Sequence, residues 1–340
     1  MSVITKFKHR SLANMRLPLF VSPMFLVSGT ELVIAASKSG VLGSFPAANA
    51  RTTEQLETWL EQISREVDLS VDGPWAINLV ANKLNTRFAS DLALTCQYQA
   101  PVVITALGHP GPVVEAVHAY GGLVFADVIS VEQARKAVNA GVDGLILVGA
   151  GAGGHTGSIG GFAFTSAVRQ FWDGLLVVAG GIANGAGILA CQALGADAAY
   201  MGTHFIAAEE SMAKQAYKQM LVDSTASDII TTDAFTGIPN NMLRPSIKAA
   251  GIDPDNIDPS ERSTINFSDP HGGAKAWRDI WSAGQGVDAI KSIQTTADIV
   301  RDLEREYAQA VEQLENHRLT TGHINFLKAG DVANASQPTT

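Results

Sequence analysis

Short apolar runs alternate with longer amphipathic stretches from residue 18 to about residue 205. Each run is continuously apolar, as in strands that are buried on both faces of a parallel sheet. The runs predict eight strands, at Pro18–Pro23, Val41–Ala47, Trp75–Val80, Pro101–Leu107, Leu123–Ile129, Gly144–Gly149, Leu175–Gly180 and Ala198–Phe205. Eight strand–helix units in one unbroken series predict an α/β protein with a (β/α)8 TIM barrel. An open doubly wound sheet is the alternative, but its usual GxGxxG does not follow the first strand, where the chain reads SPMFLVSGTE.

The stretches between the strands have the spacing and the boundaries of helices. We expect helices at Thr53–Val67, Val131–Ala140 and Gly185–Leu194. Thr52 or Thr53 and Ser130 are suitable N-caps. The segments NAGVDG and ALGADA place a glycine just past the end of a helix and lead directly into a strand.

The pattern changes after residue 206. We expect a helix at Ala207–Val222, an irregular stretch at Ser224–Ser268, a helix around Trp277–Trp281 and a long amphipathic helix at Ile299–Leu314. The predicted organisation is a barrel over residues 1–205 and a smaller, partly helical insertion over 206–290. Residues 291–340 form a helix that returns to the barrel, followed by a loose tail.

Composition limits the class of protein. The 340 residues carry 24 Lys and Arg against 33 Asp and Glu, a net charge of −9. This acidic balance argues against a nucleic-acid or anionic-membrane surface, both of which need a basic face. Only 17% of residues are charged and 46% are hydrophobic, which excludes disorder. No apolar run is long enough to span a membrane.

The cysteines and the N-terminus indicate a cytoplasmic protein. Cys96 and Cys191 are too few for a disulfide framework and read as reduced, mostly buried thiols. The first sixteen residues mix basic and apolar side chains without the apolar core of a signal peptide.

Two glycine motifs follow the last two predicted strands. Gly180-Gly181 runs into the helix that starts near Gly185, and Gly202-Thr203 lies within the eighth apolar run. Loops after strands 7 and 8 form the usual phosphate site of this fold, where main-chain N–H groups and a helix N-terminus face the anion. The sequence therefore predicts a ligand that carries a phosphate, with tight packing turns as the alternative.

The loop after the sixth strand, Gly149–Gly157, contains five glycines and one side chain with acid–base capacity, His155. Glycines let such a loop lie flat against a planar ligand, and an imidazole can exchange a proton near neutral pH. His109 follows the fourth strand and is either a turn residue or a cavity residue. His204 ends the eighth predicted strand, within reach of the predicted phosphate. No histidine and carboxylate spacing suits a metal, and no GxSxG or strand-end cysteine suits covalent catalysis.

Polar residues also interrupt the apolar strands. Asn78 lies inside WAINLV and Asp127 inside VFADVIS, while the first strand ends in Ser22-Pro23-Met24. An amide in an apolar strand costs stability unless it is paired. Asn78 is therefore either a partner of a heteroaromatic ligand or bonded to a neighbouring loop, and Asp127 is either a cavity residue or a helix cap.

Five motifs in order, SPM, INL, AGGHTG, AGGIANG and MGTHF, resemble the nitronate monooxygenase family, formerly called 2-nitropropane dioxygenases. The similarity covers roughly residues 14–250. Members of this family are FMN-dependent barrels with a helical insertion, and flavin enoyl-acyl-carrier-protein reductases and NADH:quinone reductases share the fold. The resemblance implies that the insertion covers the pocket.

The resemblance also assigns roles to single residues. His155 would deprotonate a nitroalkane or orient the substrate. The implied FMN-binding residues are Pro23 and Met24 through their backbone, Asn78, and Gly180, Gly181, Gly202 and Thr203 at the phosphate. We also expect Asp127, Gly153 and Gly154 to contact the cofactor. No metal is expected. In the implied reaction, alkyl nitronates or nitroalkanes are oxidised to carbonyl compounds and nitrite, with O2 as co-substrate. The expected partner is a small-molecule substrate, and a homodimer is a possible assembly.

The chain departs from the family pattern at three places. Val148-Gly149-Ala150-Gly151 lacks the Gln or Asp and the Glu that often precede AGGH, Asp127 stands where a basic residue often follows the fifth strand, and His204 replaces the usual Arg of GTRF. Substrate identity and flavin redox tuning depend on these positions.

Two other functions remain open. The first is an NAD(P)H-dependent flavin reductase of quinones or enoyl thioesters, although no Rossmann fingerprint is present. The second is a flavin-free barrel isomerase or aldolase that acts on a phosphorylated metabolite. Such enzymes place Lys, Asp or Glu at strand ends, where this chain offers only Asp127.

Overall fold

A computed structural model of the chain describes residues 12–82, 84–235, 237–257 and 279–320. Eight parallel strands form one sheet, in the spatial order β1-β9-β8-β6-β5-β4-β3-β2. They are β1 (Leu19–Val21), β2 (Gly43–Pro46), β3 (Trp75–Val80), β4 (Val102–Ala106), β5 (Leu123–Val128), β6 (Gly144–Val148), β8 (Leu175–Ala179) and β9 (Ala198–Met201). The two outer strands meet where Phe20 of β1 bridges in parallel to Leu42, just before β2. The sheet closes into the predicted (β/α)8 barrel, and the doubly wound alternative is wrong.

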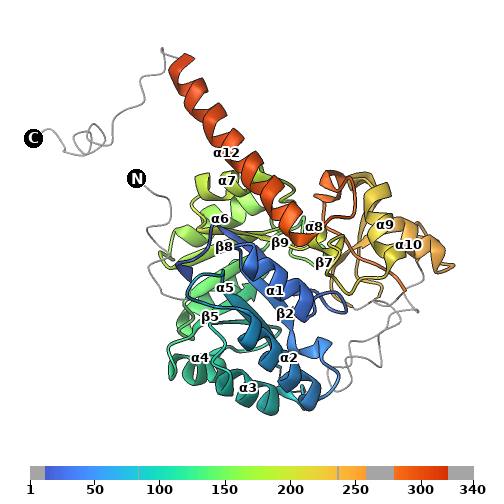
Figure 1. The fold of residues 1–340 in the computed structure, drawn as a ribbon. Coiled ribbons are helices and arrows are strands. Elements are labelled where there is room, and N and C mark those ends of the chain that lie inside the picture. The colour runs from blue at the N-terminus through green and yellow to red at the C-terminus, as the bar shows by residue number, and fades with distance from the viewer. Residues whose placement is uncertain (1–11, 83, 236, 258–278, 321–340) are drawn as a thin grey trace, which may run out of the picture.

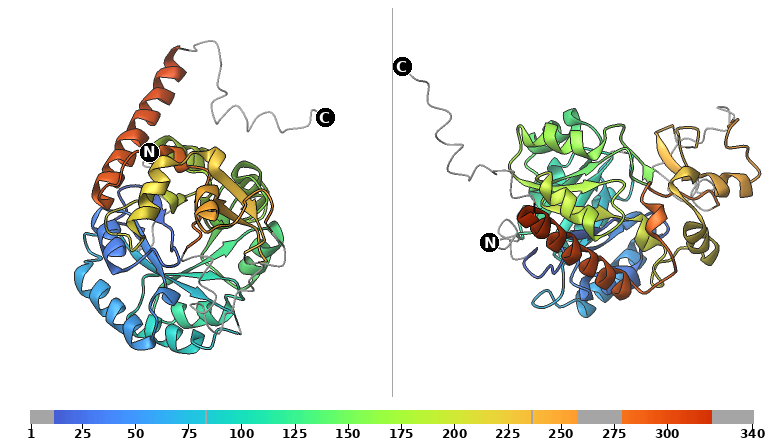
Figure 2. Two further views of the ribbon diagram at one scale, coloured as in Figure 1. Left: turned by 90° about the vertical axis from the view of Figure 1, so that its right-hand side faces the viewer. Right: turned by 90° about the horizontal axis from the view of Figure 1, so that it is seen from above.

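Helices alternate with the strands along the chain and surround them (Figures 1 and 2). They are α1 (Thr30–Lys38), α2 (Thr53–Glu66), α3 (Phe88–Gln97), α4 (Gly111–His118), α5 (Val131–Asn139), α6 (Gly161–Arg169) and α7 (Gly185–Ala193). Thr52 and Ser130 cap α2 and α5 as predicted, each accepting a hydrogen bond from a backbone N–H of the first turn. Gly141 and Gly195 leave their helices with φ of +87° and +95°, a conformation that favours glycine.

The continuous apolar runs fill two cores at once because successive side chains of a strand point to opposite faces. In β5, Leu123 and Phe125 join the cluster inside the barrel. Val124 and Ala126, the residues between and after them, join the cluster between the sheet and the helices. A barrel strand is therefore apolar at both alternating positions, except where its inner face reaches a cavity.

The eighth predicted strand is too long. β9 ends at Met201, and Thr203–Ile206 form a short helix, α8. The backbone N–H groups of Phe205 and Ile206 both donate to the Gly202 carbonyl, which turns the chain away from the sheet.

The predicted helix at Ala207–Val222 is wrong in its first half, because α9 spans only Gln215–Asp223. Before α9, backbone N–H groups bond to other parts of the chain. Glu209 N–H donates to the Gln294 carbonyl and Met212 N–H donates to the Val27 carbonyl. These long-range bonds replace the i→i−4 bonds that a helix needs.

The stretch expected to be irregular contains strands. β10 (Ile229–Thr232) pairs antiparallel with β11 (Asn240–Leu243), which pairs antiparallel with the short strand β7 (Gly154–His155) in the loop after β6. The remaining short elements are α10 (Arg244–Ala249) and the 3-10 helices η3 (Ala47–Asn49), η4 (Ala226–Asp228) and η6 (Val287–Ala289). Trp277 lies outside the described residues. Ile280 and Trp281 are not helical, since the Trp281 carbonyl accepts from Leu243 N–H beside β11.

The long C-terminal helix α12 (Thr296–Thr320) confirms the helix predicted at Ile299–Leu314 and extends it. It packs on α7 and α1, and its far end runs past the barrel (Figure 1). A Cβ on Gly185, the first residue of α7, would lie only 2.2 Å from the Tyr307 nitrogen of α12, so glycine permits this contact. The predicted tail lies outside the described residues, and the division into three units stays a prediction.

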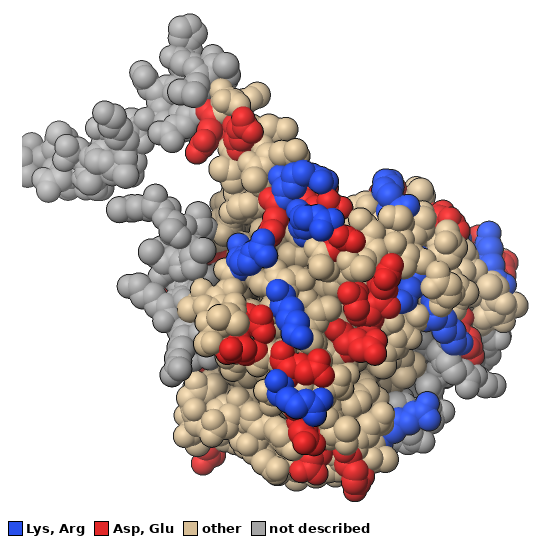
Figure 3. Space-filling view, in the orientation of Figure 1, with Lys and Arg blue, Asp and Glu red and all other residues tan. Residues whose placement is uncertain are grey.

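The surface adds two observations. On the face shown in Figure 3, acidic and basic side chains are interspersed and form no large patch of one sign. Within the described part of the chain, no helix is both long and apolar enough to cross a membrane.

Candidate active site

A cavity of about 750 Å³ opens at the carboxyl ends of the barrel strands. This is the end where barrels of this fold bind their ligands. All eleven residues that the sequence predicts for the site line this cavity: Pro23, Met24, Asn78, Asp127, Gly153, Gly154, His155, Gly180, Gly181, Gly202 and Thr203. The structure therefore brings together residues that come from six different strand ends.

The glycine loop after β6 is held by backbone contacts. A Cβ on Gly151 would lie 2.9 Å from the Gly181 nitrogen, and a Cβ on Gly153 would lie 2.6 Å from the Gly284 nitrogen. The Gly151 carbonyl accepts hydrogen bonds from the N–H groups of Gly181 and Gln285. These glycines are therefore needed for close packing of backbone on backbone, which the sequence did not indicate, and contact of the loop with a planar ligand stays a prediction.

A buried asparagine from β11 fixes the same loop. Asn241 is fully buried, and its Nδ2 donates to the carbonyl oxygens of Ala150 and Ala152 at 2.8 and 2.7 Å. Its Oδ1 accepts from the Thr231 hydroxyl at 2.5 Å. Asn241 was not predicted, since its partners lie about 90 residues away in sequence.

His155 lies on β7, where it pairs with Asn240 of β11. Its imidazole faces the cavity, and burial lowers its pKa from 6.5 to about 4. The ring is therefore uncharged at neutral pH and can accept a proton from a bound molecule.

The expected phosphate loops line the cavity, but some of their N–H groups are already used. Gly181 N–H donates to Gly151, and at the start of α7 the N–H of Gly185 donates to Glu306 Oε2 at 2.9 Å. Gly187 N–H is bonded to Asn184 Oδ1, also at 2.9 Å. The expectation that the N-terminus of α7 faces an anionic ligand is thus wrong for these groups, because Glu306 of α12 occupies it.

His204 lies on α8 and not at the end of a strand. Burial lowers its pKa, an effect that a hydrogen bond to the Ala183 backbone and the charges of Glu306 and Asp302 oppose. Its ring lines the cavity beside Thr203.

Polar side chains also project inward from three strands. Asn78 is buried on β3 and its Nδ2 donates to the Ile104 carbonyl of β4 at 3.3 Å, so a neighbouring strand satisfies part of its amide. Asp127 on β5 is buried, and burial raises its pKa from 3.8 to about 7. Tyr200 on β9 was not predicted, since its position reads as one more apolar residue. Burial, and then the charge of Asp127, raise its pKa well above 10.

Sequence similarity over nearly the whole chain connects it with a known protein family. The sequence model of the nitronate monooxygenase family matches residues 8–306 of this chain. The chain belongs to the nitronate monooxygenase family. The family resemblance inferred from five short motifs is confirmed, and the chain is an oxidoreductase.

Individual relatives agree with this family. A nitronate monooxygenase of Paraburkholderia phytofirmans is 29% identical over 345 residues, which cover 87% of this chain and 94% of that protein. Rv1533 of Mycobacterium tuberculosis, named as a monooxygenase, is 31% identical over 250 residues, 68% of this chain and 64% of that protein. Among solved structures, nitroalkane oxidase from Streptomyces ansochromogenes has a TM-score of 0.72 and 25% identity, covering 88% of this chain and 98% of that one.

The departures from the nitronate monooxygenase pattern are placed at the cavity. Val148, Asp127 and His204 all line it, as does Gly151. Each departure from the family pattern therefore lies where it changes the polarity or charge of the cavity lining.

The other histidines differ in position. His109 lines the cavity and its Nδ1 accepts from Gly111 N–H at 3.1 Å, so it serves as a turn residue and a cavity residue together. His118 lies 2.8 Å from Asp143 Oδ2 and does not line the cavity. Within the described ranges, no three His, Cys, Asp or Glu side chains come together as metal ligands would.

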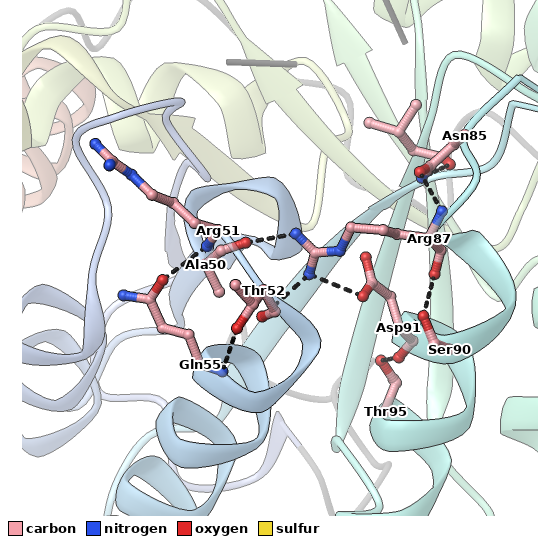
Figure 4. Close-up of polar contacts among 10 residues, drawn as sticks. Ala50, Arg51, Thr52, Gln55, Asn85, Arg87, Ser90, Asp91 and Thr95 are labelled. Carbon is pink, nitrogen blue, oxygen red and sulfur yellow. Dashed lines mark hydrogen bonds and ion pairs between the residues drawn. The ribbon is translucent and has the colours of Figure 1, made fainter. Parts of the chain in front are cut away.

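Arg87 lies in the cavity lining and connects two segments of the chain through hydrogen bonds (Figure 4). The Arg87 guanidinium donates to the carbonyls of Ala50 and Thr52 at 2.6 and 3.5 Å and to Asp91 Oδ1 at 3.0 Å. Burial raises the pKa of Asp91, although the charge of Arg87 opposes it. Arg87 thereby ties α3 to the segment that leads into α2, and both Arg87 and Asp91 line the cavity.

Proposed function

We propose that this chain binds FMN in the cavity and oxidises alkyl nitronates and nitroalkanes with O2 to carbonyl compounds and nitrite. The observation that carries the proposal is the uncharged imidazole of His155, which lies on β7 and faces a cavity that reaches both predicted phosphate loops. Family membership supports the same reaction.

The residues present fit FMN. A volume of about 750 Å³ lies within the range of cofactor pockets. Buried polar atoms of Asp127 and Tyr200 face this space without a hydrogen-bond partner in the described chain, which suits a ring with donors and acceptors at its edge. Gly202 and Thr203 would lie at the phosphate, and Pro23, Met24, Asn78, Gly153, Gly154, Gly180 and Gly181 would surround the rest. When bound, FMN would accept electrons from the substrate and pass them to O2.

His155 would act on the substrate as a general base. It would take the proton from the carbon that bears the nitro group, which converts a neutral nitroalkane into its nitronate. General base catalysis of this kind contributes about 10²- to 10⁴-fold. A nitronate added as such has already lost that proton, so it needs His155 only for orientation.

The test is oxygen uptake with propionate 3-nitronate and with neutral nitroalkanes, for wild type and His155→Gln. We expect His155→Gln to lose at least about 100-fold in kcat/KM for nitroalkanes and much less for nitronates. His109→Gln is the matched control, because it changes another histidine of the cavity and leaves β7 intact. Equal kcat/KM for nitroalkanes in wild type and His155→Gln would remove His155 from the reaction.

The same preparation tests the other functions. A purified protein that is colourless and indifferent to added FMN would favour the isomerase or aldolase. Rapid bleaching of the flavin by NADH without oxygen would favour the NAD(P)H-dependent reductase. Cytoplasmic location and a homodimer stay predictions.

A further inference from the structure

Two polar side chains lie on the inner face of the barrel where almost everything around them is apolar. Asp127 follows Leu123 and Phe125 at two-residue spacing on β5, and both of these fill the barrel interior. Tyr200 belongs to the same interior cluster and follows Ala198 on β9. Both side chains line the cavity, and they reach it from strands that β6 and β8 separate in the sheet.

Neither polar group is satisfied by the described protein. Asp127 Oδ1 and the Tyr200 hydroxyl are buried, and neither has a hydrogen-bond partner in the part of the chain that the structure describes. Buried polar atoms are nearly always paired, so two of them facing one cavity indicate a ligand that supplies the missing partners. The charge of Asp127 acts on Tyr200, which places the two groups within electrostatic reach of each other.

The charges around the cavity do not favour an ionised Asp127. Arg87, directly before α3, is paired with Asp91, and Lys136 on α5 is paired with Glu132. Other titratable groups that face the cavity are His109 after β4, His155 on β7, His204 on α8 and Tyr217 on α9. Burial alone accounts for the raised pKa of Asp127, so the described chain provides no nearby cation to hold it as a carboxylate.

We propose that Asp127 is a protonated carboxylic acid in the ligand-binding state and that, with the Tyr200 hydroxyl, it donates hydrogen bonds to the acceptor atoms at one edge of the FMN ring. This proposal rests on the proposed function, because it assigns the contacts of the same cofactor. An acid that has lost its proton cannot donate and repels the lone pairs of ring oxygen and nitrogen atoms. Proton release from Asp127 therefore weakens binding of the ring.

The expected effect follows from linkage. If the ring binds only when Asp127 is protonated, and its pKa is about 7, affinity falls about tenfold between pH 6 and pH 8. The phosphate of FMN titrates near pH 6, so it adds its own pH dependence. Riboflavin carries the same ring without a phosphate and isolates the effect of the protein.

The experiment is titration of flavin-free protein with riboflavin and with FMN from pH 5.5 to 8.5, followed by quenching of flavin fluorescence. We expect the dissociation constant of wild type for riboflavin to rise about tenfold from pH 6 to pH 8. Asp127→Asn keeps a donor and cannot ionise, so its affinity for riboflavin should not change with pH. Tyr200→Phe should bind more weakly at every pH and keep the pH dependence of wild type. Circular dichroism of each variant checks that the barrel is folded.

Each outcome decides between the two proposals. If wild type and Asp127→Asn show the same pH dependence for riboflavin, the role of Asp127 is refuted and FMN binding stands. A wild-type affinity for riboflavin that is constant from pH 6 to pH 8 refutes it as well, whether or not the variants fold. If wild type binds neither flavin at any pH, the proposed function itself is refuted.

Discussion

Replacing Asn241 by leucine tests whether β11 holds the glycine loop that follows β6. Leucine has nearly the same shape but no polar atoms, so the carbonyl oxygens of Ala150 and Ala152 lose the donor that lies 2.8 and 2.7 Å away. Each buried group left without a partner costs about 1–3 kcal/mol. Because Asn241 is fully buried, water cannot replace it without rearrangement of the loop. We expect the free energy of unfolding to fall by about 3 kcal/mol.

The assay has a global and a local part. Urea denaturation of the flavin-free protein reports the free energy of unfolding, and hydrogen exchange of a peptide covering residues 149–157 reports opening of the loop. Exchange in this peptide should become faster in Asn241→Leu, because the loop loses a fixed anchor on β11.

Thr231→Val is the matched variant. It removes only the hydroxyl that donates to Asn241 Oδ1, on a strand that is partly exposed, so it should cost about 1 kcal/mol and leave exchange in the loop nearly unchanged. A change below about 0.5 kcal/mol in Asn241→Leu, with unchanged exchange at residues 149–157, would refute the assignment. The backbone contacts of Gly151 and Gly153 would then be sufficient to hold the loop.

Three further predictions follow from the site. Burial raises the pKa of Asp127 from 3.8 to about 7, so the native state binds this proton more tightly than the unfolded chain does. Wild type therefore loses up to about 4 kcal/mol of stability as the pH rises from about 4 to 7. In urea denaturation, flavin-free Asp127→Asn should be more stable than wild type at pH 8 but not at pH 4. Gly153→Ala places a Cβ 2.6 Å from the Gly284 nitrogen and should lower the free energy of unfolding by about 1–3 kcal/mol. Gly160→Ala is the control, because nothing lies within 4 Å of its Cβ. Its free energy of unfolding should stay within about 0.5 kcal/mol of wild type. Arg87→Met leaves the buried Asp91 without its cation and should lower the midpoint of thermal unfolding at pH 7. Adding Asp91→Asn should recover part of this loss. No recovery would mean that the hydrogen bonds of Arg87 to the carbonyls of Ala50 and Thr52 account for the effect.

The barrel and the position of the cavity could be predicted because both depend on local pattern. Continuous apolar runs are required wherever a strand is buried on two faces, and strand ends of a barrel converge on one rim. The eleven predicted residues therefore line one cavity although they are spread from residue 23 to residue 203. The eighth strand was predicted too long because Phe205 continues its apolar pattern, whereas the Gly202 carbonyl accepts the first bonds of α8 and the chain turns there.

The residues that sequence reasoning missed act through distant partners. Asn241 bonds to residues about 90 positions earlier, and Glu306 bonds to Gly185 over 121 positions. No periodicity records such pairs. Two adjacent asparagines before Met242 and Leu243 are a weak local signal, since an apolar strand accepts amides only when they are paired.

The glycine loop shows that a glycine-rich composition does not by itself indicate a mobile loop. Glycine serves two different purposes, a positive φ or a close approach of backbones, and the first is compatible with a mobile loop. Gly151 and Gly153 serve the second, since neither has a positive φ and each would place a Cβ against another backbone segment. A loop rich in glycine for this reason is tightly packed, and His155 continues it as part of a strand. The imidazole therefore already faces the cavity in the folded chain, which suits the general-base role that we propose, because a misplacement of about 1 Å can cost 100-fold in rate.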